Sequence, residues 1–144
     1  MRYFTKNTTF RLKNKRIINS WIKEIIVKEG KIPQNISFIF CDDLYLSELN
    51  KTYLKHKTLT DIITFDYCED NFVSGEIYIS VERVRENAIK FKKSFNDELY
   101  RVMIHGVLHL IGYADKKHSE MLTIRAKEDK CLILLNKLFS TCST

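Results

Sequence analysis

Several features that would assign a chain to a special class are missing from this sequence. No apolar run approaches the roughly 18 residues that a membrane-spanning helix needs. The N-terminus lacks the apolar core of a signal peptide. There is no internal repeat, low-complexity segment or linker. We therefore expect a cytoplasmic protein with no membrane contact.

Paired cysteines are also missing. The chain has four cysteines, scattered singly, and none forms a C-x-x-C pair. This excludes a cysteine-based zinc site and a thioredoxin-like redox motif. In a cytoplasmic chain we expect all four to be reduced thiols.

The overall composition is that of one ordinary globular domain. The chain has 144 residues, of which 44% are hydrophobic and 29% are charged, so we expect one domain over 1–144. The formal net charge is +6. An excess of positive charge suits a polyanionic partner, although it does not identify one.

The spacing of apolar residues predicts an interleaved series of strands and helices. We expect strands at 2–6, 36–40, 61–65 and 75–80. We expect helices at 13–29, from 42 or 43 through 53, at 81–91, at 97–111 and at 119–138, with a loose tail at 140–144. The last two strands can form a hairpin, so the fold class is α/β or α+β with one small mixed sheet.

Two histidines four residues apart form the most informative motif. His105 and His109 lie in the predicted helix 97–111, so both imidazoles project from one face. Gly112 follows where helices commonly end with positive φ, and Asp115 arrives ten residues after His105. Two imidazoles and a loop carboxylate predict a three-ligand metal site with an open fourth position, as in catalytic zinc sites. The spacing is that of the metzincin motif.

The motif leaves alternatives open. The two histidines can be ordinary polar residues on a helix edge, but their apolar neighbours indicate a buried helix, where unpaired imidazoles are costly. Asp115 can equally be a turn or capping residue, with His118 as the alternative third ligand. Gly106 stands where peptidases carry a Glu base. We expect Gly106→Glu to crowd the site without abolishing folding.

Four stretches of the chain, 49–53, 60–65, 75–80 and 105–113, form a further pattern. In chain order, they look like an L-N-x-x-[FY] helix, a T-D-V-L-S-F strand, a G-D-I-x-I-S strand and a histidine signature. Together they resemble the YbeY family of bacterial metal-dependent endoribonucleases.

The resemblance implies a four-stranded mixed sheet packed with about five helices. It also implies one zinc ion per chain, held by His105, His109 and Asp115. The implied function is a single-strand-preferring, zinc-dependent endoribonuclease in ribosomal RNA maturation (16S rRNA 3′-end processing) and ribosome quality control. Expected partners are ribosomal RNA or the small ribosomal subunit, with ribosome-associated proteins as further candidates. The alternatives are a metallopeptidase, against which Gly106 argues, and a non-catalytic ribosome-associated zinc protein.

Two positions depart from the family's usual residues. The family commonly has His where this chain has Asp115, and Arg where it has Leu54. Because phosphate contacts need cations, we expect Lys51, Lys55 and Lys57 to replace the missing Arg in RNA binding. The alternative is that these lysines form a solvated face.

No general base is evident next to the motif. Candidate catalytic residues are Asp61 and Ser80, which the resemblance places near the cleft, and Arg101, which precedes His105 by four residues. The alternative roles are helix capping or strand hydrogen bonding for Asp61 and Ser80, and a surface ion pair for Arg101.

Overall fold

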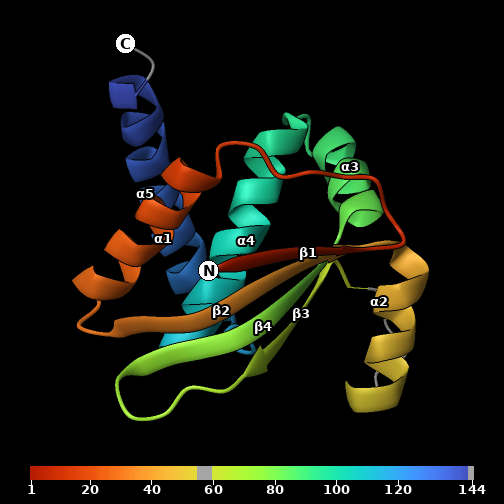
Figure 1. The fold of residues 1–144 in the computed structure, drawn as a ribbon, viewed down its shortest axis with the longest axis horizontal. Coiled ribbons are helices and arrows are strands. Elements are labelled where there is room, and N and C mark those ends of the chain that lie inside the picture. Colours follow the sequence, from red (N-terminus) through yellow and green to blue (C-terminus); the bar gives the residue numbers. More distant parts are fainter. Residues whose placement is uncertain (55–59, 143–144) are drawn as a thin grey trace.

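The computed structural model describes residues 1–54 and 60–142, without the side chain of Leu54, and its strands form one mixed sheet (Figure 1). The sheet order is β1-β2-β4-β3. β1 is parallel to β2 and β2 to β4, whereas β3 is antiparallel to β4. The strands are β1 (Arg2–Lys6), β2 (Ile32–Cys41), β3 (Ile62–Asp66) and β4 (Phe72–Ser80). The predicted α+β class with a small mixed sheet and a β3–β4 hairpin is confirmed.

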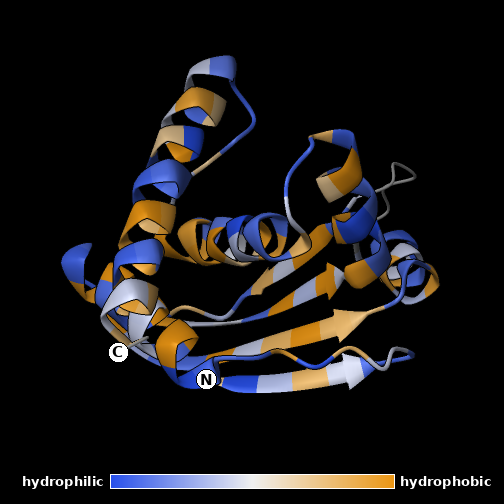
Figure 2. Cartoon of the chain, turned by 90° about the horizontal axis from the view of Figure 1, so that it is seen from above, coloured by the Kyte–Doolittle hydropathy of each residue, from blue (hydrophilic) through white to orange (hydrophobic). Residues whose placement is uncertain are grey.

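Helices cover the two faces of the sheet unequally. Phe38 of β2 and Ile77 of β4 point into the main core, which α1, α4 and α5 complete. The opposite face is covered at one end by α2, where Leu46 packs on Ile63. Figure 2 shows hydrophobic residues on the strands beneath the helical layer. The helices are α1 (Lys15–Lys28), α2 (Asp43–Leu49), the π-helix η1 (Asn50–Leu54), α3 (Val81–Lys90), α4 (Phe95–Ile111) and α5 (His118–Cys142).

Short polar side chains begin three of these helices. The Asp42 carboxylate accepts the Tyr45 N–H before α2. The Ser94 hydroxyl accepts the Asp97 N–H at the start of α4. Each pair satisfies one N–H that has no partner within the helix. Ser80 caps α3 in the same way.

Several predicted boundaries were wrong, and β4 begins at Phe72 instead of residue 75. β2 begins at Ile32 and passes through Pro33, because the register shift between Pro33 and Ile36 provides the irregularity that a proline in a strand requires. The helix expected to reach residue 53 is α-helical only to Leu49 and continues as η1. The tail expected to be loose from residue 140 continues α5 to Cys142. Within the described residues, no helix is long and apolar enough to cross a membrane.

Helix α4 approaches the sheet closely at Gly106. A Cβ added there would lie 2.9 Å from Cγ2 of Ile77 and 3.0 Å from Cδ1 of Ile62. Position 106 therefore faces the core and not the open side of the histidine pair. The expectation that Gly106→Glu would crowd the site is corrected: the carboxylate would enter an apolar contact, where burial of an unpaired charge is costly.

The two buried glycines should respond differently to alanine. At Gly75 a Cβ would lie 2.5 Å from the backbone oxygen of Phe65, whereas at Gly106 it meets only isoleucine side chains. We expect Gly75→Ala to destabilise the protein by about 1–3 kcal/mol, as overpacking does. Gly106→Ala should cost less, because alanine in a helix interior gains about 1 kcal/mol over glycine. Urea unfolding followed by circular dichroism measures both, and a larger loss at Gly106 would contradict the prediction.

Candidate metal centre

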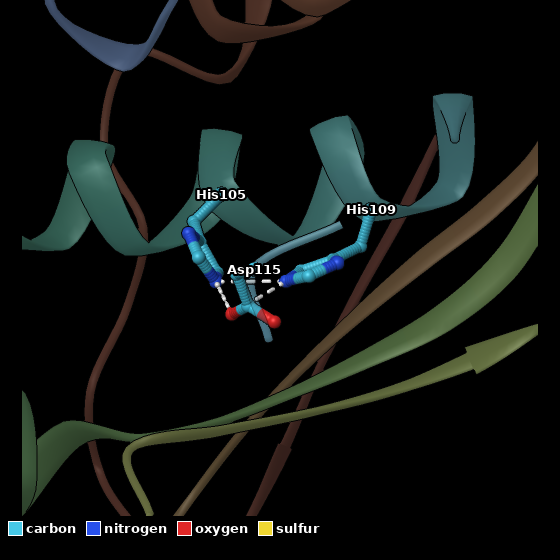
Figure 3. A group of neighbouring side chains, drawn as sticks. All are labelled: His105, His109 and Asp115. Carbon is cyan, nitrogen blue, oxygen red and sulfur yellow. Dashed lines mark hydrogen bonds and ion pairs between the residues drawn. The ribbon is translucent and has the colours of Figure 1, made fainter. Parts of the chain in front are cut away.

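His105, His109 and Asp115 bring three ligand atoms together. The two Nε2 atoms are 3.0 Å apart. Asp115 Oδ2 lies 3.1 Å from Nε2 of His109 and 3.4 Å from Nε2 of His105. Figure 3 shows both imidazoles pointing to the same side of α4 and meeting the carboxylate that follows the helix. These side chains form the only group of three or more His, Cys, Asp or Glu residues, among those described, that could hold a metal ion.

The end of α4 delivers the carboxylate to the histidines. Gly112 has φ of +126°, and its N–H and that of Tyr113 donate back to the carbonyl of Leu108. The Tyr113 hydroxyl donates to Glu29 at 3.0 Å, and Lys127 pairs with the same carboxylate at 2.8 Å. These contacts anchor the turn after α4 to Glu29, which follows α1, and to Lys127 of α5. The loop that follows the turn then places Asp115 beside the two histidines of α4.

The separations suit a small divalent cation. Zinc binds nitrogen and oxygen ligands at about 2.0–2.2 Å, which places tetrahedral ligand atoms about 3.3–3.6 Å apart. The observed separations of 3.0–3.4 Å overlap the lower end of this range. The three side chains are 23–40% exposed, so water or a substrate can reach the open side. The donor set therefore fits a mononuclear site with a free position.

A buried carboxylate on α5 supports the first histidine, and the sequence analysis missed it. Glu128 is 3% exposed. Its Oε2 lies 2.6 Å from Nδ1 of His105, and its Oε1 accepts from Arg101 at 2.9 Å. Burial alone would lower the pKa of His105, but the hydrogen bond and charge of Glu128, with Asp115 and Asp61, raise it overall.

Two hollows meet at the candidate metal centre. The hollow along the β3 edge has a volume of about 560 Å³ and the one between α3, α4 and α5 about 260 Å³. Asp61, Ile62, His105 and Asp115 line both. Burial raises the pKa of the Asp61 carboxyl, and Asn87 is 3.5 Å from its Oδ2. Asp61 is thus the candidate catalytic residue that the fold brings to the metal centre.

The second hollow contains further charged groups. Arg101 lines it, but this side chain pairs with Glu128 and with Asp129 and is only 11% exposed. The ion pair is therefore largely buried and not a surface one. Glu98 also lines this hollow, and burial raises its pKa. Arg125 lines it as well and makes no ion pair with any residue that the structure describes.

Other predicted site residues lie elsewhere. Ser80 is fully buried, accepts the Arg83 N–H and lines neither hollow, so it has the capping role. His118 is exposed at the first turn of α5 and is not in the metal-ligand group. Lys51 is exposed on η1 and lines neither hollow. Lys55, Lys57 and the side chain of Leu54 lie outside the described residues.

The fold and the site define a class: small α+β proteins with a candidate metal centre on one helix and the loop that follows it. The family described as Endoribonuclease YbeY matches residues 3–136. The chain belongs to this family.

Individual relatives are similar to this protein in sequence or structure over nearly the whole chain. "Endoribonuclease YbeY" of Flavobacterium psychrophilum is 48% identical over 133 residues, which cover 92% of this chain and 95% of the relative. The protein of the same name from Karelsulcia muelleri is 48% identical over 132 residues, 92% of this chain and 94% of its own. The solution structure of TM1509 from Thermotoga maritima has a TM-score of 0.63 at 30% identity, covering 99% of this chain and 95% of that one.

Substitution should distinguish the two candidate third ligands. We propose Asp115, because its oxygen lies with both Nε2 atoms whereas His118 is exposed on α5. Asp115→Ala should weaken zinc binding by more than the roughly 10–100-fold that loss of a supporting hydrogen bond costs. Asp115→His should keep the metal, and His118→Ala should bind like the unsubstituted protein. Competition with a chromophoric chelator measures the three constants, and the reverse order for the alanine variants would make His118 the ligand.

Proposed function

We propose that this protein is a metal-dependent endoribonuclease that hydrolyses phosphodiester bonds in single-stranded RNA. The proposed biological role is ribosomal RNA maturation, including the 3′ end of 16S rRNA, and ribosome quality control in the cytoplasm. Ribosomal RNA or the small ribosomal subunit is the proposed partner. The observation that carries the proposal is the meeting of His105, His109 and Asp115 between two hollows, in a chain of the Endoribonuclease YbeY family.

The proposed cofactor is one zinc ion per chain. Two imidazoles and one carboxylate are ligands that zinc prefers, and three protein ligands leave a position for water or substrate. When bound, the ion would polarise a phosphoryl oxygen and lower the pKa of a water molecule. Asp115 in place of a third histidine reduces the net positive charge of the site, so the water should be acidified less than at an all-histidine site.

Side chains of the protein itself would accept the proton of the attacking water and bind the RNA phosphates. Asp61 opens onto both hollows, and its raised pKa makes the carboxylate a better proton acceptor than an ordinary aspartate. Lys116 lines the hollow along β3 and Arg125 lines the other. A strand of RNA crossing the metal centre would bring phosphates toward a cation on each side. These two residues therefore join Lys51, Lys55 and Lys57 as candidates for RNA binding.

Removal of the metal should abolish cleavage of RNA. We expect the purified protein to cut a structured ribosomal RNA fragment with single-stranded ends, and to lose this activity after chelation. Added zinc should restore it. His105→Ala and His109→Ala should each lose both metal and cleavage, because an open three-ligand site cannot spare a ligand. Gel analysis of labelled RNA and elemental analysis of the same samples are the measurements.

Two controls separate this proposal from its alternatives. Casein in parallel reactions tests for a metallopeptidase, and chelator-sensitive proteolysis without RNA cleavage would contradict the proposal. The His118→Ala variant keeps the three proposed ligands and should cleave RNA normally. A metal-loaded protein that cleaves neither substrate would favour a non-catalytic zinc protein.

Loss of the two cations beside the metal centre should weaken RNA binding but leave the metal in place. The variant combines Lys116→Gln with Arg125→Gln, both exposed residues. We expect lower affinity for single-stranded RNA and a flatter salt dependence, by up to about 0.7 in log–log slope for each lost contact. Fluorescence anisotropy over a range of salt concentrations measures both.

The matched control removes the same charge away from the hollows. Lys23 and Lys137 are exposed and line neither hollow beside the metal centre. Lys23→Gln combined with Lys137→Gln should leave the salt slope nearly unchanged. If the control and the Lys116/Arg125 variant behave alike, the RNA path does not follow the two hollows, and the lysines at 51, 55 and 57 become the leading candidates.

A further inference from the structure

Glu128 holds the first proposed metal ligand by one of its two carboxylate oxygens. Oε2 lies 2.6 Å from Nδ1 of His105, while Oε1 accepts from Arg101 at 2.9 Å. The Glu128 side chain is 4% exposed. Both oxygens are thus engaged by protein groups at short hydrogen-bonding distances, as is usual for a charged acceptor.

We infer that Glu128 is a positioning residue that sets the tautomer and the ring orientation of His105 for metal binding. This inference rests on the proposed metal site and adds a residue to it. An ionised carboxylate only accepts hydrogen bonds, so the proton of a neutral imidazole must be on Nδ1. The lone pair is then on Nε2, the atom that lies 3.0 Å from Nε2 of His109 and 3.4 Å from Asp115. Carboxylates that hold metal-bound histidines in this way also increase the basicity of the ligand.

Arg101 pairs with the Glu128 carboxylate and holds it in place. A buried ionised carboxylate is stable only when it is paired and hydrogen-bonded. Arg101 supplies that pairing from α4, one turn before His105, and its second nitrogen binds Asp129 at 2.6 Å. We therefore assign Arg101 to the support of Glu128, and not to direct contact with the substrate.

Asp129 provides a comparison within the same network. It binds the same arginine as Glu128, but its side chain is 57% exposed and has no contact with His105. If the ion pairs between α4 and α5 were purely structural, substitution of either acidic residue would change zinc affinity to a similar extent. If Glu128 positions His105, only substitution of Glu128 should lower zinc affinity.

The test compares Glu128→Gln with Asp129→Asn, two substitutions that remove one charge each. Glutamine has one acceptor oxygen and an NH₂ group, so it cannot present an acceptor at both of the positions that face Arg101 and His105. We expect Glu128→Gln to weaken zinc binding by roughly 10–100-fold. Asp129→Asn should bind zinc as the unsubstituted protein does. Chelator competition gives the constants, and circular dichroism confirms that both variants are folded.

The position of the His105 ring proton can be measured first in the unsubstituted protein. Two-bond ¹⁵N–¹H correlation spectra of the metal-free, unsubstituted protein distinguish a proton on Nδ1 from one on Nε2. At a pH where the ring is neutral, we expect the His105 proton on Nδ1. The same spectrum of Glu128→Gln should show a shift toward the Nε2-protonated form, whereas Asp129→Asn should not.

The outcomes separate this inference from the proposed function. A His105 proton on Nε2 in the unsubstituted protein would overturn the inference, even if Glu128→Gln failed to fold. Unchanged zinc affinity in folded Glu128→Gln, with zinc still bound by the unsubstituted protein, would also overturn it and leave the metal site intact. A protein that binds no zinc would overturn the proposed cofactor, and the positioning role with it. If the zinc affinities of the protein and its variants are as expected but no RNA is cleaved, only the nuclease proposal is overturned.

Discussion

The close packing of α4 on the sheet is the constraint on which the site depends. Gly106 has no side chain, so the helix lies close against Ile62 and Ile77. His105 and His109 extend from the flank of that buried helix, beside the open edge of β3. The helix cannot rotate without breaking this apolar contact, in which Ile77 is fully buried. Packing of hydrophobic residues thus determines where the two imidazoles point.

The candidate metal centre lies among acidic side chains, some of which are buried. Among the residues that the structure describes, Asp61, Glu98, Asp115 and Glu128 line the second hollow, against two cations, Arg101 and Arg125. Burial raises the pKa of Asp61 and of Glu98, so the surrounding protein disfavours their negative charge. A divalent cation in this acidic environment would relieve that cost. RNA phosphates are repelled by the same carboxylates, which is why the exposed cations at the rim are the groups proposed to receive them.

Much of the fold could be predicted because local patterns agree with the final structure. β4 and α4 are rich in the apolar residues that the structure buries, and Gly112 ends α4 with the positive φ that its position requires. One error arose where contacts outside the segment override the local pattern. The strand was predicted to begin at residue 36, beyond Pro33, yet β2 pairs with β4 on both sides of a register shift. The last turn of α5 continues past residue 140 although its sequence is polar.

The sequence by itself determined the candidate ligands. A helical turn places His105 and His109 on one face, and the spacing predicts that the turn at Gly112 returns the chain toward them. The contact of Tyr113 with Glu29 then fixes the turn that brings Asp115 to the histidines. Only the tertiary structure decided what surrounds these ligands. Glu128 is 23 residues from His105 and contacts it solely because α5 crosses α4 at that point. Arg101 likewise changes from a candidate active-site cation to the partner of Glu128, 27 residues away. No local pattern encodes the crossing of two helices, because it results from the packing of the whole core.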